Sequence, residues 1–248
     1  MTALALLRHA LACLLVAAAG TGTARAAPAF ENSMAQRTLA CTACHGAQGR
    51  AGPDGYYPRL AGKPVGYLYN QLLNFREGRR DYALMTHLVD PLSDSYLMEM
   101  AGYFSALDLP YTAPPRPAAA REVLRRGQAL VMQGDAARRL PACVSCHGSA
   151  MTGVAPNVPG LLGLPRDYLN AQLGSWRAGK RRAHAPDCMA QVVKLMSDED
   201  IHAAASWLAA QPVPAVSKPA SASAAPLLPG AAPSLSCGTA PPPAGAAR

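Results

Sequence analysis

Apolar residues recur at helical spacing in several short stretches of the chain. Within residues 63–77, Leu68, Leu72 and Phe75 fall at positions i, i+4 and i+7, which predicts an amphipathic helix. Ser93 then precedes a second apolar stripe, and a serine at that place is typical of a helix N-cap, so a further helix is expected after it. The second stripe consists of Leu97, Met100, Ala101 and Phe104. The pattern indicates an all-α protein.

The same order of elements occurs a second time along the chain. The sequence YLNAQL at 168–173 matches YLYNQL at 67–72, and residues 159–163 match residues 58–62. Further matches are Trp176 with Phe75, residues 179–181 with 78–80, and Ser197 with Ser93. Helices are also expected over 33–40 and 121–132, ahead of the central part of each copy. The repeat is too long and occurs too few times for a solenoid, so it predicts two tandem domains of one fold.

The chain divides into five predicted segments: a secretory signal peptide at 1–26, a first domain at 27–109, a Pro-rich linker at 110–117, a second domain at 118–211 and a disordered Ala/Pro-rich tail at 212–248. The signal peptide is inferred from an apolar run that ends at the small-residue cleavage pattern Ala24-Arg25-Ala26. The tail holds almost no charged residue and too little apolar surface to order itself.

The predicted leader indicates export to the periplasm. Its apolar run is too short to span a bilayer, and the residues before Cys13 form a poor lipoprotein signal. Weak or no direct membrane anchoring is therefore expected.

Composition and charge narrow the possible functions. Aromatic residues make up only 6% of the 248 residues, so side chains alone would give each domain a thin core, which a large apolar cofactor would fill. The formal net charge is +8, but Lys and Arg are scattered in short groups without interleaved aromatic residues. This distribution argues against nucleic-acid binding and is compatible with docking to an acidic protein partner.

The motif C-x-x-C-H, which is typical of c-type haem attachment, occurs at 41–45 and again at 143–147. Two thiols at this spacing bond to the two vinyl groups of one haem, and the adjacent His directs its imidazole at the iron. The predicted thioether residues are Cys41, Cys44, Cys143 and Cys146, and the predicted axial ligands are His45 and His147. The sequence therefore predicts two covalently bound haem c groups.

Two other kinds of site also use closely spaced cysteines. A zinc site needs four ligands, whereas each copy of the motif offers only three clustered ones. A thioredoxin-like redox pair would lie in a strand-then-helix context, which neither copy shows. The duplicated motif favours haem over both.

The second axial ligand separates electron carriers from enzymes, because Met closes the coordination sphere whereas an open position permits peroxide or oxygen chemistry. Met85 lies in an expected loop eight residues before Ser93, and Met189 lies eight residues before Ser197. This shared register predicts Met85 and Met189 as the second ligands. The alternatives are a vacant position or one of the neighbouring residues His87, Met98, Met100, His184 and Met196.

The sequence raises two further hypotheses about the surroundings of these ligands. The carbonyls of Pro58 and Pro159 follow the two motifs at matching positions and are candidates to accept a hydrogen bond from each histidine Nδ1. Cys188 and Cys237 are the cysteines that remain outside the leader and the motifs, and disulfides persist in the periplasm. A Cys188–Cys237 bridge would tie the tail close to the second haem.

Several polar residues also recur in both copies. They are Tyr67, Tyr168, Gln71 and Gln172. Either they hydrogen-bond a haem propionate or the methionine sulfur, or the tyrosines pack within helices and the glutamines face solvent. The basic residues that follow each helix either contact haem propionates, face an acidic partner or complement the helix dipole. They are Arg79, Arg80, Lys180, Arg181 and Arg182.

Taken in order, these motifs resemble the dihaem cytochrome c4 family. The resemblance rests on the two C-x-x-C-H-G motifs, on residues 58–62, on Tyr67 to Arg80 and on Met85 with the helix start at 92–94, and it spans about residues 31–211. It implies two class I cytochrome c folds, each with a His/Met-ligated haem. Cys188 and the long tail lie outside the family pattern.

The predicted function is that of a periplasmic electron-transfer protein, not an enzyme, which shuttles single electrons between respiratory-chain partners. The resemblance implies redox protein partners, either a terminal oxidase or a membrane-bound quinol-oxidising complex, and no small-molecule substrate. An alternative is the electron-accepting cytochrome subunit of a periplasmic dehydrogenase. A dihaem peroxidase is the other alternative, but a Met in both copies argues against the exchangeable iron position that it requires.

Overall fold

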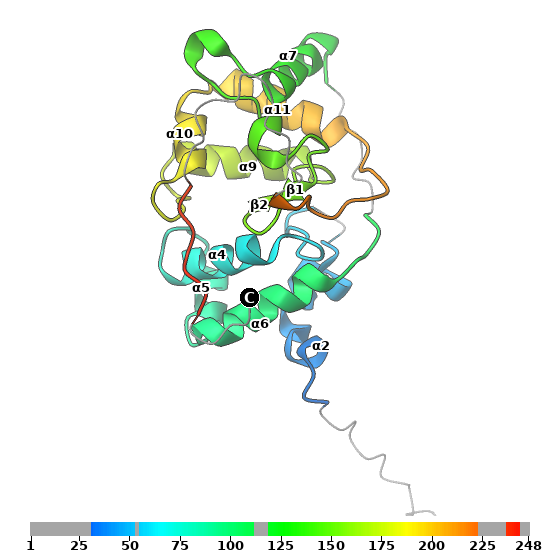
Figure 1. Cartoon of the computed structure of the whole chain (residues 1–248), viewed down its shortest axis with the longest axis vertical. Helices are drawn as coiled ribbons and strands as arrows, with labels where there is room; N and C mark the ends of the chain where they lie inside the picture. Colours follow the sequence, from blue (N-terminus) through cyan, green and yellow to red (C-terminus); the bar gives the residue numbers. More distant parts are fainter. Residues whose placement is uncertain (1–30, 53–54, 112–118, 223–236, 244–248) are drawn as a thin grey trace, which may run out of the picture.

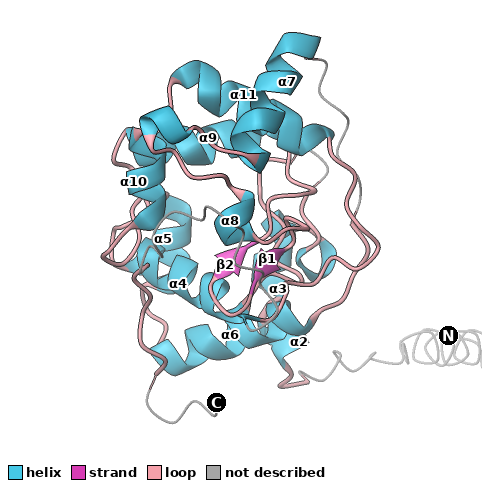
Figure 2. Ribbon diagram, turned by 45° about the horizontal axis from the view of Figure 1, so that its top comes forward, coloured by secondary structure: helices cyan, strands magenta, loops and turns pink. Residues whose placement is uncertain are grey.

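The structure, a computed structural model, describes four stretches of the chain: residues 31–52, 55–111, 119–222 and 237–243 (Figure 1). Within them nearly all regular structure is helical, which confirms the predicted all-α class. One small antiparallel sheet is present, in which β1 (Gly153–Val154) pairs with β2 (Val158–Pro159) (Figure 2). The predicted signal peptide lies outside the described residues, as does most of the predicted linker.

The first group of helices surrounds an apolar cluster that includes Leu68, Leu73, Leu97 and Phe104. Its elements are α2 (Met34–Arg37), α3 (Leu39–His45), the 3-10 turn η1 (Ala47–Gly49), α4 (Val65–Arg76), α5 (Ala83–Val89) and α6 (Asp94–Ala106). The long helices α4 and α6 pack against each other, as the two predicted apolar stripes require.

The second group of helices surrounds a separate cluster that includes Val131, Leu169, Val193 and Leu208. Its elements are α7 (Arg121–Met132), the 3-10 turn η2 (Ala136–Arg138), α8 (Val144–His147), α9 (Arg166–Arg177), α10 (Cys188–Lys194) and α11 (Asp198–Ala210). The helix expected over 121–132 is thus present with the same bounds. Among the described residues, no helix is long and apolar enough to cross a membrane.

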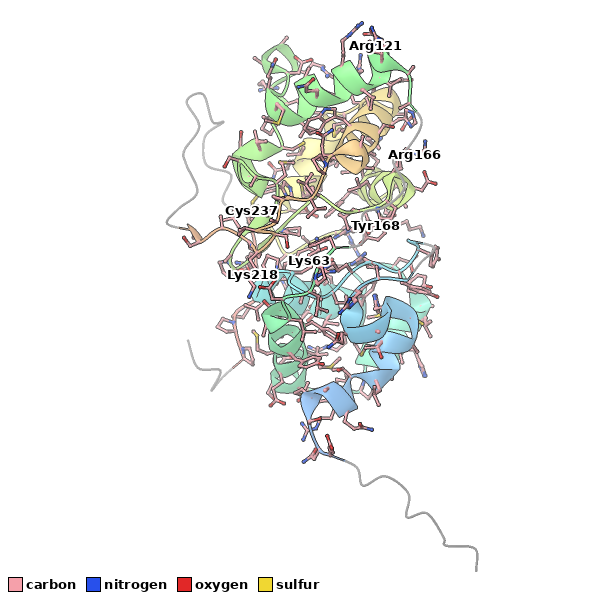
Figure 3. The ribbon with its side chains drawn as sticks, turned by 90° about the vertical axis from the view of Figure 1, so that its right-hand side faces the viewer. Lys63, Arg121, Arg166, Tyr168, Lys218 and Cys237 are labelled. Atoms are coloured by element: carbon pink, nitrogen blue, oxygen red, sulfur yellow. A yellow bond between two sulfur atoms is a disulfide. The ribbon has the colours of Figure 1, made fainter. Side chains whose placement is uncertain are left out.

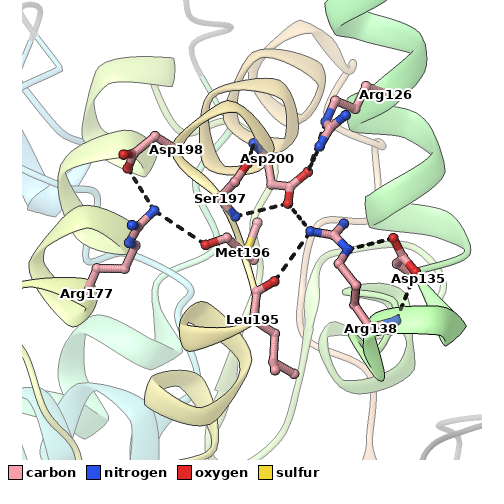
Figure 4. A network of polar contacts seen from close by, with 9 residues as sticks. All are labelled: Arg126, Asp135, Arg138, Arg177, Leu195, Met196, Ser197, Asp198 and Asp200. Atoms are coloured by element: carbon pink, nitrogen blue, oxygen red, sulfur yellow. Dashed lines mark hydrogen bonds and ion pairs between the residues drawn. The ribbon is translucent and has the colours of Figure 1, made fainter.

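The two predicted serine caps are present. The Ser93 hydroxyl accepts a hydrogen bond from the Tyr96 backbone N–H at the start of α6. At the start of α11, the Ser197 hydroxyl accepts from the Asp200 N–H while the Asp200 carboxylate accepts from the Ser197 N–H, which completes a capping box. The Asp200 carboxylate also binds Arg126 of α7 and Arg138 of η2, so the same residue joins three elements (Figure 4).

The segments expected as ligand-bearing loops are short helices instead. Met85 lies in α5 and Met189 lies in α10, each a helix of seven residues. Helices this short are not stable by propensity alone, so tertiary packing decides whether they form. Val89 of α5 and Val193 of α10 are both fully buried, which supplies that packing.

The tail also differs from the disordered segment that its composition predicts. Residues 212–222 and 237–243 belong to the described part of the chain. Ala220 exchanges backbone hydrogen bonds with the β1 region, donating to Gly153 and accepting from Ala155. Cys237 forms the hypothesised disulfide with Cys188. The tail is ordered by its hydrogen bonds to a strand and by a covalent cross-link, neither of which can be predicted from composition.

Two candidate haem sites

The first C-x-x-C-H motif occupies α3, and His45 is the last residue of that helix. The His45 side chain is buried, and its Nδ1 lies 2.8 Å from the Pro58 carbonyl oxygen, which confirms the predicted contact. Because a carbonyl only accepts, Nδ1 carries the proton and Nε2 is left as the free metal-binding atom. Burial lowers the pKa of His45, which keeps the imidazole neutral, as metal ligation requires.

The second motif repeats this arrangement in α8. His147 is the last residue of the helix and is buried, and its Nδ1 lies 2.7 Å from the Pro159 carbonyl oxygen. Pro159 belongs to β2, so the small hairpin holds that acceptor in place. Burial again lowers the pKa of the histidine. Two histidines of the same tautomer therefore stand at equivalent places in the two groups.

None of the four motif cysteines forms a disulfide, so their sulfurs remain available for attachment to haem. Cys41 packs against the first apolar cluster and Cys143 against the second. Burial raises the pKa of the Cys143 thiol to about 11, so this sulfur favours its neutral form. An apolar setting of this kind suits a thioether more than a thiolate.

The two predicted methionine ligands stand next to the same two clusters. Met85 packs partly buried against the first cluster, which Cys41 also contacts. Met189 packs partly buried against the second cluster, which Cys143 also contacts. In each group, the predicted methionine ligand and the first cysteine of the motif therefore pack against the same apolar cluster.

The residues considered as alternative axial ligands lie in different surroundings from Met85 and Met189. Met100 and Met196 are buried members of the two cores, at 7% and 8% exposure. His184 is engaged by Arg79, whose guanidinium nitrogen lies 2.8 Å from His184 Nε2. Met98 packs partly buried against the first cluster, and His87 belongs to α5, two residues after Met85.

The repeated basic segments of the two groups meet face to face. Arg80 and Arg181 form an antiparallel bridge, with the Asp81 N–H donating to the Lys180 carbonyl and the Arg182 N–H donating to the Arg79 carbonyl. These are equivalent positions of the repeat, so the two groups are related by an approximate twofold axis at this point. Sequence comparison alone does not show that the copies contact each other through these residues.

The side chains around that axis form an arginine cluster, which we define as Arg80, Arg181, Gln71 and Gln172. Each arginine donates to the glutamine of its own group and to that of the other, over distances of 2.7–3.0 Å. The hydroxyls of Tyr67 and Tyr168 lie at 3.5 and 3.4 Å from the arginine of the opposite group. The recurring Tyr and Gln residues are therefore interface residues.

The arginine cluster carries two adjacent positive charges without a carboxylate partner among the described residues. Arg181 is only 4% exposed, and both burial and the neighbouring Arg80 lower its pKa. Arg181 also stacks on Trp176, whose buried indole N–H has no hydrogen-bond acceptor in the described part of the structure. A buried cation beside a second positive charge, together with a buried orphan donor, forms surroundings that an anion stabilises. Haem propionates would supply such an anion, so the residues present fit the predicted cofactor.

Comparison with known proteins agrees with this arrangement. No family model matches the chain. A thiosulfate dehydrogenase electron acceptor of Thiomonas intermedia is 39% identical over 188 residues, which cover 76% of this chain and 86% of that protein. Cytochrome c4 of Pseudomonas aeruginosa is 33% identical over 201 residues, covering 80% and 96%. The solved structure of reduced cytochrome c4 from Pseudomonas stutzeri superposes with a TM-score of 0.59 at 30% identity, covering 71% of this chain and 95% of that one.

The chain belongs to the cytochrome c4 family. Members of this family are dihaem c-type cytochromes, and the chain is accordingly an electron-transfer protein and not an enzyme. The family resemblance inferred from the motifs is thereby confirmed.

This cytochrome c4 relative also contains a buried charge that sequence reasoning missed. Lys63 extends from the first group to the second, where its Nζ donates to the Gly160 carbonyl at 3.0 Å (Figure 3). The side chain is only 5% exposed. Burial, and to a lesser degree the charge of Arg59, lower the pKa of Lys63 from 10.5 to about 8. A lysine directly after the 58–62 motif gives no sequence signal of burial.

The lowered pKa of Lys63 predicts that stability rises with pH in the alkaline range. Between pH 8 and 10.5 the folded protein releases this proton before the unfolded chain does, so the unfolded chain binds more protons and the free energy of unfolding increases. From pH 7.5 to 10 the gain is about 2 kcal/mol. Denaturant titrations at both pH values should show it, whereas Lys63→Met should not. If the free energy of unfolding depends on pH in the same way in the natural chain and in Lys63→Met, the lowered pKa of Lys63 is contradicted.

Proposed function

We propose that the chain binds two haem c groups covalently and carries single electrons through the periplasm. Domain bounds of 27–109 and 118–211, with an N-terminal secretory leader, follow the sequence interpretation. One haem would be held by thioethers to Cys41 and Cys44 with His45 and Met85 on the iron. The other would be held by Cys143 and Cys146 with His147 and Met189 on the iron.

The duplicated contact between a buried histidine Nδ1 and a proline carbonyl carries this proposal. When bound, each haem supplies one iron that cycles between Fe(II) and Fe(III). The protein fixes the histidine tautomer, presents a thioether sulfur from α5 or α10, and excludes water from the surroundings with its apolar clusters. Methionine ligation and burial both favour the reduced iron and so raise the potential.

The arginine cluster supports a path between the two sites. It lies where the two groups meet, and its buried positive charge would stabilise propionate carboxylates from either side. The residues at this interface would hold propionates of both haems, and the bound haems would supply the electron transfer. Electrons would then pass between the groups without leaving the protein.

A thiosulfate-oxidising dehydrogenase is the electron donor that we propose. The support is the similarity to a protein named as the electron acceptor of thiosulfate dehydrogenase, at 39% identity. The present chain would then pass its electrons on to a terminal oxidase, which is the class of acceptor that the family resemblance implies. A quinol-oxidising complex is the alternative donor.

Haem stoichiometry and spectra of the purified protein test the proposal. The expected result is two haems per chain, retained after denaturation, with both irons low-spin and the methionine–iron charge-transfer band present. Cys143→Ser combined with Cys146→Ser should leave one haem, and the matching change of Cys41 and Cys44 should leave the other. A high-spin iron that binds cyanide or peroxide readily would overturn the assignment of an electron carrier.

The donor is tested by mixing the oxidised protein with thiosulfate and a thiosulfate dehydrogenase. Rapid reduction of both haems is expected only when enzyme and thiosulfate are both present. Mixtures that lack either component serve as controls. If a quinol-oxidising complex with its quinol reduces the protein and the dehydrogenase does not, the donor assignment is wrong while the carrier function stands.

A further inference from the structure

The disulfide between Cys188 and Cys237 distinguishes the second candidate haem site from the first. Cys188 is the first residue of α10 and directly precedes Met189. At the equivalent place in α5 stands Leu84, which is 45% exposed and has no such cross-link. The two methionines therefore belong to similar seven-residue helices, of which only one is covalently anchored at its start.

The residues around the disulfide hold the start of α10 in further ways. The Asp187 carboxylate caps the helix, accepting from the Ala190 N–H at 3.0 Å and from the Ala183 N–H at 2.7 Å. The Gly238 N–H donates to the Pro186 carbonyl at 2.9 Å. Gly238 lies so close to the carbonyls of Ala185 and His184 that a side chain there would collide with backbone. The tail is thus seated tightly on the loop that leads to Met189.

From this point the tail continues onto the first group of helices. The Ala240 N–H donates to the Asn70 side-chain oxygen at 2.8 Å, and Ala240 packs against the first apolar cluster. Figure 1 shows this segment, in red, running from α10 past α4 and α5. We call residues 237–243 the strap. The strap connects the start of the Met189 helix to the opposite half of the molecule.

We propose that the Cys188–Cys237 disulfide is a redox-sensitive latch that positions Met189, and that its reduction lowers the potential of the second haem while leaving the first unchanged. A short helix depends on its tertiary anchors, and α10 loses its covalent one when the disulfide opens. Met189 is then held less firmly, which weakens methionine ligation and its effect on the potential. The inference rests on the proposed assignment of Met189 as an axial ligand.

The reductant would be a dithiol, such as the active-site cysteines of a thiol–disulfide oxidoreductase. One of its thiolates attacks a sulfur of the Cys188–Cys237 bond, and the resulting mixed disulfide is resolved by the second thiol. Two electrons and two protons reach the chain, giving two cysteine thiols, while the dithiol becomes a disulfide. The iron atoms take no part in this exchange.

The test compares the two haems within one protein. The double variant C188S/C237S is measured beside the natural chain, and a chain that ends after residue 243 serves as the matched control because it keeps the whole strap. Midpoint potentials of both haems are determined, and the two ligand-methionine methyl resonances are followed by NMR of the reduced protein. Limited proteolysis reports independently of haem whether residues 237–243 have been released.

The expected result is a lower second potential, a shifted or lost Met189 methyl resonance, an unchanged first haem and faster cleavage of the strap. The proposal is overturned if the strap is released but both potentials stay unchanged. It is also overturned if both haem potentials shift equally, or if the strap of the double variant remains protected from proteolysis. If the double variant does not fold, the natural chain treated with a phosphine reductant is measured instead. A natural chain without methionine ligation at the second iron would show that the proposed ligand set, not the latch, is wrong.

Discussion

Replacing Asp200 with Asn is expected to lower the free energy of unfolding by about 3 kcal/mol, the lower end of the range for breaking a buried ion pair. The Asp200 side chain is 0% exposed and binds Arg126 and Arg138, as well as the Ser197 N–H (Figure 4). An amide retains one acceptor but loses the charge that pairs with two guanidinium groups. The arginines are partly exposed and regain water, which limits the loss.

Asp198→Asn is the matched control for this change. Asp198 lies two residues away in the same helix and pairs with Arg177 at 2.8 Å, but its side chain is 85% exposed. An exposed ion pair contributes little, so a loss of about 0.5 kcal/mol or less is expected. Denaturant titrations of both variants give the comparison. If both variants lose the same free energy of unfolding, burial of the Asp200 ion pairs does not stabilise the fold more than an exposed pair does.

The same network predicts how stability depends on acid. Burial alone would raise the pKa of Asp200, but hydrogen bonds from Arg138, Ser197 and Arg126 outweigh it and lower the pKa from 3.8 to about 2. A lowered carboxyl pKa stabilises the fold above pH 4, and that contribution of about 2 kcal/mol is lost as the pH falls toward 2. The Asp200→Asn variant should lack this part of the acid dependence.

Replacing Met85 or Met189 with Ala is expected to convert one of the two haems from low-spin to high-spin. With Met85 and Met189 as the proposed axial ligands, each change would remove a methionine sulfur from one iron, so the variant should lose about half of the methionine–iron absorption. The affected haem should also fall in potential by on the order of 0.1 V or more, within the roughly 0.8 V range over which axial ligands set potentials. EPR spectra and redox titrations measure both effects.

Met100→Leu and Met196→Leu are the controls for the ligand assignment. Both residues are buried in the apolar clusters, so leucine should preserve the packing and leave both low-spin haems intact. If Met196→Leu halves the band and Met189→Ala leaves it unchanged, Met196 and not Met189 is the axial methionine of the second haem. The first site offers the same comparison between Met85 and Met100.

Features that depend on neighbours in the chain could be read from the sequence. Helix spacing predicted α4, α6 and α7, and the serine caps of α6 and α11 follow from hydrogen bonds three residues apart. The two haem motifs also recur, and the proline carbonyl that each histidine contacts follows 13 residues after His45 and 12 residues after His147. Their geometry arises within one repeat.

Features that depend on long-range packing and cross-linking could not be predicted from the sequence. The helices that carry Met85 and Met189 are too short to be predicted from propensity, and burial of Val89 and Val193 accounts for them. Composition predicted disorder for the residues of the strap, because composition does not indicate a disulfide to a residue far away in the sequence.

The sequence by itself determined the all-α class, the duplicated motifs and the family, because covalent spacing and helical periodicity are local properties. The tertiary structure decided where the repeats meet. Arg80 and Arg181 lie 101 positions apart, yet they share the same two glutamines across an approximate twofold axis. Lys63 is buried where the second group supplies a carbonyl that accepts its hydrogen bond. Long-range packing brings the two arginines together and buries Arg181 and Lys63, and a buried cation is stabilised by an anion or a hydrogen-bond acceptor.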